Sequence, residues 1–374
     1  MMTVFHIISR FDIGGAERVA LNISKSNSKN IEYHLIEIAA ADSNYTVQFI
    51  KEAEDNGVTV HRAKVRNTKL AMLAFPSRLA ALIRKFHPSI IHTHTEVPDL
   101  SLYLYSIYSG NLLKNIGIVR TIHNNQLWNR WKWIGKKVEK FMQNKASNIA
   151  ISESTRDSYS DEYGSVCQII HNGVETTTQK LFPELVKGKL NILFAGRMEY
   201  QKGIDSLIDV VSHYGNDTRF VFHIIGSGSE KDKVTQALSK FDNVAFKDRI
   251  PLLASQLGSF DYLFMPSLFE GLALTPMEAS IAGTPTIINN AKGLSETLPQ
   301  DWPLKVNNND LREYIKIFEN LSNLDYKLLQ SLAEKYTIQR FSLSEMQNNY
   351  EKLYYEICRQ ATNTCLLYTS DAAD

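Results

Sequence analysis

Residues 264–289 read FMPSLFEGLALTPMEASIAGTPTIIN, and this stretch joins a strand, a glycine loop and a helix start. The apolar run at 261–265 is followed by a proline, which predicts a buried strand that ends at this point. The loop at 268–274 follows it and leads into a helix. Strand, loop and helix in this order are the repeating unit of parallel α/β sheets.

The helix start carries its own sequence pattern. Thr275 fits the N-cap, Pro276 the first helical position and Glu278 the third position of a capping box, and Gly283 ends the helix. A loop that leads into a helix directs several backbone N–H groups and the positive end of the helix dipole toward one point. The segment therefore predicts a binding site for phosphate or another anion.

Two carboxylates flank this helix start, Glu270 in the loop and Glu278 in the helix. Glu270 lies where no strand ladder needs it, so we expect it to accept hydrogen bonds from ligand hydroxyl groups. Two interpretations remain open for Glu278. It either binds a ligand or closes the capping box by bonding the Thr275 N–H.

Length and composition limit the class of protein. A chain of 374 residues fits two domains, and 41 basic against 40 acidic residues argue against a nucleic-acid partner. The first residues lack the basic region of a signal peptide, and no apolar run has membrane-spanning length, so we expect a cytoplasmic protein. The three cysteines, Cys167, Cys358 and Cys365, form no disulfide or zinc pattern.

Strand and helix patterns alternate along the whole chain, which predicts parallel sheets with helices on both faces and ligands at the carboxyl ends of the strands. The predicted strands are 4–9, 33–39, 89–94, 117–123, 148–152, 168–171, 190–195, 220–225 and 284–289. The predicted helices are 16–24, 77–86, 205–214 and 230–241, with a largely helical region at 310–359.

These elements predict an α/β fold with two Rossmann-like domains. We place the first domain at 1–178 and the second at 179–340, with a helix at 341–360. The last ten residues, 365–374 (CLLYTSDAAD), resemble a translated sequencing adapter, and we expect them to be a non-native tail.

Several polar residues lie where predicted strands end. Gly14 and Gly15 follow the first strand and either approach a ligand or form a tight turn. His92 and His94 share one face of a strand; we find no third metal ligand in the sequence nearby and expect a structural role, with a place at the acceptor cleft as the alternative. His123 follows another strand and is either a ligand contact or a buried, hydrogen-bonded histidine.

Two cations frame the loop GRMEYQKG that follows the strand 190–195. Arg197 can grip a phosphate with a fork of donors and Lys202 offers a mobile point charge, so the pair suits a diphosphate. Each is alternatively an ordinary surface cation. The glycines of the GSG at 226–228 lack the third glycine of a dinucleotide fingerprint.

Residues 128–145 (WNRWKWIGKKVEKFMQNK) combine three tryptophans and six basic residues with a single acid, Glu139. Such a helix either lies on an anionic membrane surface or is a solvated helix with its aromatic rings packed inward. The basic residues are Arg130, Lys132, Lys136, Lys137, Lys140 and Lys145.

The motif GR-x4-KG followed by E-x7-E, together with the early GGAER, resembles the retaining glycosyltransferases of family 4, which have the GT-B fold. This resemblance implies two domains that face each other across a cleft, and a last helix, 341–360, that returns to the first domain. It implies catalytic roles for His123, Glu270, Arg197 and Lys202. It implies a donor site built from Gly15, Arg197, Lys202, Glu270, Gly271, Leu272, Ala273, Leu274, Thr275 and Glu278.

In that family the two cations bind the diphosphate, the second glutamate holds the ribose, and the first glutamate and the histidine contact the donor sugar. Ala273 departs from the glycine of many relatives and puts the identity of the sugar in doubt. The chain contains no D-x-D, so we expect no metal and no other cofactor besides the nucleotide-sugar co-substrate.

The motifs also resemble those of enzymes of capsule and exopolysaccharide assembly. This implies transfer of a hexose to a lipid-linked saccharide at the inner membrane face. Two alternatives remain open, a glycosyltransferase that acts on a lipid headgroup or a small soluble acceptor, and a catalytically silent GT-B module that binds nucleotide-sugar.

Overall fold

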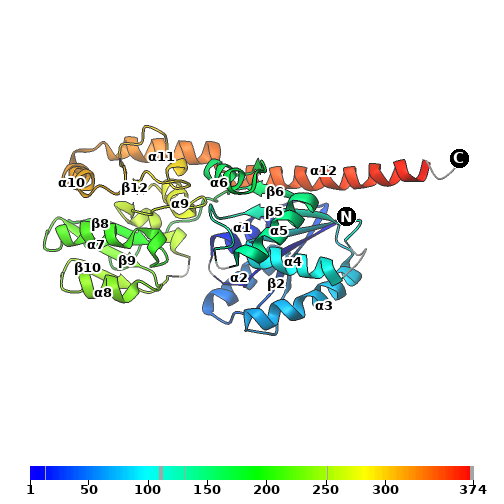
Figure 1. Ribbon diagram of the computed structural model, residues 1–374. Coiled ribbons are helices and arrows are strands. Elements are labelled where there is room, and N and C mark those ends of the chain that lie inside the picture. The colour runs from blue at the N-terminus through cyan, green and yellow to red at the C-terminus, as the bar shows by residue number, and fades with distance from the viewer. Residues whose placement is uncertain (13, 109–112, 130, 251, 371–374) are drawn as a thin grey trace. The chain divides into compact units, whose positions relative to one another are not determined.

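The computed structural model describes residues 1–370 except 13, 109–112, 130 and 251, and for 361–370 it describes the backbone alone. The chain forms two compact units (Figure 1), which consist of Met1–Gly173 with Leu343–Asp374, and of Val174–Ser342. Each unit is built on a sheet in which every pair of neighbouring strands is parallel. The predicted α/β class with two Rossmann-like halves is confirmed.

Unit 1 contains a seven-stranded sheet in the order β3-β2-β1-β4-β5-β6-β7. Its strands are β1 (Met2–Ile8), β2 (Ile31–Glu37), β3 (Thr59–His61), β4 (Ile90–His94), β5 (Gly117–Ile122), β6 (Ala146–Ala150) and β7 (Gln168–Ile169). Its helices are α1 (Gly15–Ser24), α2 (Asn44–Asp55), α3 (Thr68–Phe86), α4 (Glu96–Tyr108), α5 (Lys132–Lys145), α6 (Glu153–Tyr163) and α12 (Leu343–Ser370).

Unit 2 contains a six-stranded sheet in the order β10-β9-β8-β11-β12-β13. Its strands are β8 (Leu190–Ala195), β9 (Phe220–Ile225), β10 (Val244–Lys247), β11 (Tyr262–Met265), β12 (Thr286–Asn289) and β13 (Lys305–Val306). Its helices are α7 (Ile204–His213), α8 (Lys231–Leu238), α9 (Leu274–Ala282), α10 (Leu311–Asn320) and α11 (Tyr326–Arg340), with short 3₁₀ turns at Tyr200–Lys202, Leu253–Ser259, Ser295–Thr297 and Leu321–Asn323.

The central strands of both sheets are buried because helices cover both of their faces. All residues of β1, β4 and β9 are buried. The last helix, α12, packs against α1 and β5 of unit 1 and buries Met346, Tyr350 and Tyr354 there. Among the described residues, no helix has both the length and the apolar character needed to cross a membrane.

Helix α3 begins earlier than the predicted helix at 77–86. Asn67 caps it by accepting hydrogen bonds from the N–H groups of Lys69 and Leu70 at 3.1 and 3.2 Å. Pro76 lies inside this helix. The sequence pattern places the start of this helix at Ser77, just after the proline, but the asparagine cap and the buried side chains of Met72 and Phe75 outweigh the missing N–H.

A buried ion network fixes the sheet of unit 1 to two helices. The Arg120 side chain, on β5, is 1% exposed and bonds both carboxylate oxygens of Glu139 on α5, at 2.6 and 2.7 Å. It also donates to Asp99 on α4 at 2.7 Å. Trp128 and Tyr159 donate to the same Glu139 carboxylate, at 2.6 and 2.8 Å, so its oxygens are well satisfied.

Replacing Arg120 is therefore expected to destabilise the protein strongly. Arg120→Met leaves two buried carboxylates without their positive partner, and removing one member of a buried ion pair costs about 3–5 kcal/mol. Urea unfolding followed by tryptophan fluorescence measures this loss, since Trp128 lies in the network.

The matched control is Arg219→Met. Arg219 also pairs with two carboxylates, Asp217 and Glu319, but its side chain is 48% exposed. Water screens such a pair, and its loss is expected to cost no more than about 1 kcal/mol. Equal losses for the two variants would contradict the structural role of Arg120.

Candidate functional site

Helix α9 of unit 2 begins at Leu274, and Ala273 stands at its N-cap. The predicted N-cap at Thr275 and first helical position at Pro276 are therefore wrong. The start is shifted because the N–H of Ala273 donates to the carbonyl of Gly293 at 3.3 Å, which holds Ala273 in an extended conformation. Pro276 remains in the first turn, where a missing N–H costs nothing.

This helix start has no side-chain cap from Ala273, whose methyl group accepts no hydrogen bond. Glu278 lies in the second turn, beyond the third helical position that a capping box requires. The first N–H groups of a helix have no partner within the helix. The segment around Leu274 and Thr275 thus retains the character of an anion site.

Glu270 is buried just before this helix, with 7% of its surface exposed. One carboxylate oxygen accepts from Lys202 Nζ at 2.6 Å and the other from Gln201 Nε2 at 3.2 Å. The backbone N–H of Glu270 donates to the carbonyl of Lys292 at 2.9 Å. The sequence predicted a ligand acceptor, and the structure places that carboxylate in an ion pair.

The two predicted phosphate-binding cations differ in their surroundings. The Lys202 side chain is 15% exposed and is held by Glu270. It also passes close to Gly196, where an added Cβ would lie 3.6 Å from its Cε. Arg197 is exposed, and none of the described side chains pairs with it. The ammonium group of Lys202 is thus fixed in place, whereas the Arg197 side chain is exposed to solvent.

Glycine allows the loops of this edge to touch through their backbones. Gly203 has a φ of +67°, and a Cβ there would lie 1.9 Å from the Pro266 carbonyl oxygen. Gly293 has a φ of +71°, and a Cβ there would lie 2.0 Å from the Glu270 carbonyl oxygen. Both positions therefore require glycine for conformation and for space. These contacts position Lys202 and Glu270 at the carboxyl ends of β8 and β11.

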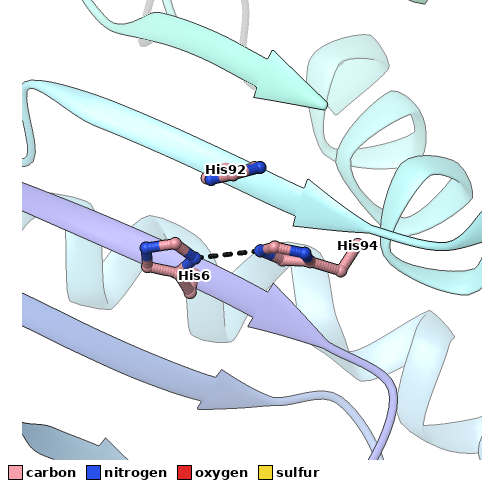
Figure 2. Close-up of side chains that lie close together, drawn as sticks. All are labelled: His6, His92 and His94. Carbon is pink, nitrogen blue, oxygen red and sulfur yellow. Dashed lines mark hydrogen bonds between the residues drawn. The ribbon is translucent and has the colours of Figure 1, made fainter. Parts of the chain in front are cut away.

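A group of histidines occupies the sheet of unit 1. His6 lies on β1 and His92 and His94 lie on the neighbouring β4 (Figure 2). His6 Nδ1 and His94 Nε2 are 2.9 Å apart and share a hydrogen bond. We had found no third residue near His92 and His94. This was wrong, because the parallel register pairs His6 with His92 across strands that are far apart in the sequence.

Hydrogen bonds engage these three rings with one another and with hydroxyl groups. His92 bonds Tyr354 through Nδ1 and Thr121 through Nε2, each at 2.7 Å. Three such imidazoles with nitrogens within 4.8 Å could hold a metal ion. A metal needs a lone pair from each ring directed at one point about 2 Å away, whereas here the rings already bond other groups. The expected structural role of His92 and His94 agrees with this geometry.

His123 extends this group to the end of β5. Its Nε2 lies 3.1 Å from His94 Nδ1, and the residue is 8% exposed. Burial lowers the pKa of His6 and of His123 to about 3. Burial and the neighbouring histidines hold the pKa values of His92 and His94 well below 6.5. All four rings are therefore neutral at physiological pH.

The predicted site residues fall into two groups. Unit 2 contains Arg197, Lys202, Glu270 and Glu278 with the loop 271–275, and the structure joins Lys202 to Glu270. Unit 1 contains His123 and Gly15, the exposed first residue of α1. Their assignment to ligands stays a prediction. The sequence analysis missed Gln201 and His6, and only the sheet order would have pointed to His6.

The neutral histidines predict that acid destabilises the protein. In the unfolded chain their pKa values return to about 6.5, so below this pH the unfolded state binds more protons than the folded state. The free energy of unfolding is then expected to fall as the pH drops from 6.5, by up to about 1.4 kcal/mol per pH unit and histidine. Urea unfolding at pH 6.5 and pH 5 measures the slope.

His94→Gln should reduce the pH dependence of the free energy of unfolding by the contribution of one histidine. His87→Asn is the matched control, because His87 is exposed and asparagine tolerates its left-handed backbone conformation. A slope in His94→Gln equal to that of the unmodified chain would contradict the neutral state of His94.

Two protein-family models match the chain. The model described as Glycosyltransferase Family 4 matches residues 13–178, and the model described as Glycosyl transferases group 1 matches residues 189–323. The first matched segment lies almost entirely in unit 1, and the second lies in unit 2.

Similar proteins include two from capsule systems and one solved structure. An uncharacterized 41.2 kDa protein in the cps region of Klebsiella pneumoniae is 29% identical over 46% of this chain, which spans about half of that relative (48%). The capsular polysaccharide biosynthesis glycosyltransferase CapH of Staphylococcus aureus is 23% identical over 79% of this chain and 83% of its own. The crystal structure of Anabaena HepE in complex with UDP-glucose shares the fold, with a TM-score of 0.79, 16% identity and coverage of 95% and 100% of the two chains.

Proposed function

Because the chain belongs to the family 4 glycosyltransferases, we propose that it transfers a sugar from a nucleotide-sugar to a hydroxyl group with retention of configuration. The Lys202–Glu270 ion pair beside the start of α9 carries this proposal. It fixes the Lys202 ammonium group at the carboxyl edge of the sheet, and Glu270 shortly precedes a helix N-terminus that has no side-chain cap. Both features stabilise a diphosphate that gains negative charge as it leaves.

In this proposal each residue has a separate task. Arg197 and Lys202 bind the diphosphate, assisted by backbone N–H groups of residues 271–275. Glu278 holds the ribose. Glu270 fixes Lys202 and contacts the sugar, and His123 contacts the sugar from unit 1.

The chemical step needs no covalent intermediate on a carboxylate. Glu270 is already engaged by Lys202 and Gln201, which makes it a poor nucleophile. The resemblance to the family implies that the leaving phosphate accepts the proton of the acceptor hydroxyl on the same face. The cations would then stabilise the phosphate through charge alone, and the sequence pattern calls for no metal at this position.

The diphosphate assignment predicts the behaviour of Lys202→Ala. UDP should raise the melting temperature of the unmodified chain, because a ligand that binds only the folded state stabilises it by about 2.7 kcal/mol at 100 times its Kd. Lys202→Ala is expected to lose most of this shift because the fixed ammonium group is absent. A thermal-shift series with UDP, GDP and ADP measures it and also identifies the base.

Lys231→Ala is the control, since Lys231, on α8 of the same unit, makes an exposed ion pair with Asp248. A full UDP shift in Lys202→Ala would contradict the assignment. Release of free UDP from a UDP-sugar would separate an enzyme from a silent binding module, which should release none.

For the acceptor we propose a lipid-linked saccharide used in surface polysaccharide assembly at the inner membrane face. The similarity to CapH, a capsular polysaccharide biosynthesis glycosyltransferase, supports this class of pathway. Helix α5 supports contact with an anionic membrane, because it presents lysines together with Trp133, whose surface is 70% exposed. Trp128 packs inward and Trp131 is partly buried, so only one of the three rings is available to lipid. Arg130 lies outside the described residues.

Neighbouring helices also carry exposed apolar side chains. Helix α4 contacts both α3 and α5 (Figure 1), and the exposed apolar residues of the three helices include Leu70, Leu73, Ile107, Tyr108 and Trp133. The exposed lysines of α5 are Lys132, Lys136, Lys137, Lys140 and Lys145.

Vesicle binding tests this surface. The chain is expected to sediment with vesicles that contain anionic phospholipid and less with neutral vesicles, because each lysine near an anionic surface contributes about 1 kcal/mol. Lys136→Glu with Lys137→Glu should weaken this binding at least tenfold. The same charge change at Lys231 and Lys233, on α8 of unit 2, is the control. Equal effects of the two double variants would contradict specific membrane binding through α5.

A further inference from the structure

The hydrogen-bond network around His6, His92 and His94 extends from the buried face of α12 to His123. It begins at Tyr350 on α12, which is 0% exposed and whose hydroxyl contacts Thr121 Oγ1 at 2.8 Å. It continues through His92 to Tyr354, also on α12. From Tyr354 it passes to His6 Nε2 at 3.5 Å, and then through His94 to His123.

The buried end of the network determines where its hydrogens lie. Tyr350 and Thr121 each carry one hydroxyl hydrogen, and a buried O–H without an acceptor is costly. Their only acceptors in this network are the two hydroxyl oxygens and His92 Nε2. Both hydrogens find an acceptor only if Tyr350 donates to Thr121 and Thr121 donates to His92 Nε2.

Each later bond then has a single possible direction, because a neutral imidazole has one donor and one acceptor nitrogen. His92 carries its hydrogen on Nδ1 and donates to Tyr354. The Tyr354 hydroxyl must donate to His6 Nε2, so His6 donates from Nδ1 to His94 Nε2. His94 in turn donates from Nδ1 to His123 Nε2.

At His123 the network leaves one nitrogen for a ligand. Its Nε2 accepts from His94, so its own hydrogen is on Nδ1. Among the described residues none bonds this Nδ1, yet it does not belong to the buried polar atoms that lack a partner, so it reaches solvent. It lies directly after β5, at the carboxyl edge of the sheet where α/β folds bind ligands.

We propose that this network fixes His123 as a neutral Nδ1–H tautomer, so that His123 meets its ligand as a hydrogen-bond donor and not as a base. His94 and, behind it, His6, His92 and the two tyrosines are positioning residues. The identity of the ligand rests on the proposed function, which puts the donor sugar at His123, but the tautomer does not. The atom recognised is therefore an oxygen with a lone pair, either a sugar hydroxyl or a phosphate oxygen.

The low pKa of His123 agrees with this role. A ring that stays neutral keeps its Nε2 available to accept from His94, whereas an imidazolium would have two donors and would oppose the His94 N–H. A neutral donor also polarises an oxygen without transferring a proton to it. The proton of the acceptor hydroxyl is then left to the departing phosphate, as the proposed function requires.

Nuclear magnetic resonance of the full chain tests the tautomer without any ligand. Long-range correlation of ring protons with ¹⁵N in histidine-labelled protein distinguishes a protonated from an unprotonated nitrogen, and the spectrum of His123→Gln identifies the His123 signals. We expect a protonated Nδ1 and an unprotonated Nε2 at pH 7. A protonated Nε2, alone or together with a protonated Nδ1, would overturn the proposal even if UDP-sugar turnover is observed. The expected tautomer without turnover would refute only the proposed function.

A matched pair of variants tests the role of His94. The amide of His94→Gln can donate to His123 Nε2 and should retain the Nδ1–H tautomer, whereas His94→Leu cannot donate and should give a mixture of tautomers. If UDP-sugar turnover is present, it should fall about tenfold further in His94→Leu than in His94→Gln, the effect of one lost hydrogen bond.

An unchanged tautomer of His123 in His94→Leu would show that His94 does not determine this tautomer. If His94→Leu does not fold, the unmodified chain and His94→Gln still test the proposal. Loss of the Nδ1–H tautomer of His123 in His94→Gln would also contradict it.

Discussion

Both sheets are parallel and covered on both faces, so every polar group within them must find a partner away from water. This constraint explains the arrangement of unit 1. Arg120 enters the core with two carboxylates that match its donors. The histidines enter it as neutral rings that bond one another and the hydroxyl groups of Tyr354 and Thr121. At the strand ends polar groups no longer need a partner within the sheet, and there they become available to ligands.

The two units meet the constraint with different chemistry. Unit 2 holds a charge at its sheet edge by pairing Lys202 with a buried carboxylate, which suits a ligand that carries negative charge. Unit 1 holds a neutral ring at its edge through a chain of hydrogen bonds. In the transfer reaction that we propose, the leaving group is anionic while the sugar offers hydroxyl oxygens, so the two edges suit different parts of the donor.

The sequence predicted the fold class well because helical and strand patterns alternate regularly and the turns carry glycine and proline. It predicted Lys202 and Glu270 as neighbours through their motifs, although nothing in their spacing indicates an ion pair. Local pattern misplaced the N-cap of α9, since the contact that fixes Ala273 comes from Gly293, in another loop. The third histidine was missed for the same reason. His6 and His92 meet only through strand order, which periodicity along the chain does not contain.

The alanine at the N-cap of α9 implies a conflict between protein stability and ligand binding at this position. Serine or aspartate there would close the first turn and strengthen the helix by about 1 kcal/mol. The same side chain would occupy the Thr275 N–H, because Pro276 has none, and this N–H belongs to the phosphate site that we propose. A chain selected only for heat resistance would thus be expected to acquire such a residue and to lose affinity for its substrate. Under the proposed function, residue 273 is therefore a position where one added oxygen atom would improve folding and impair catalysis.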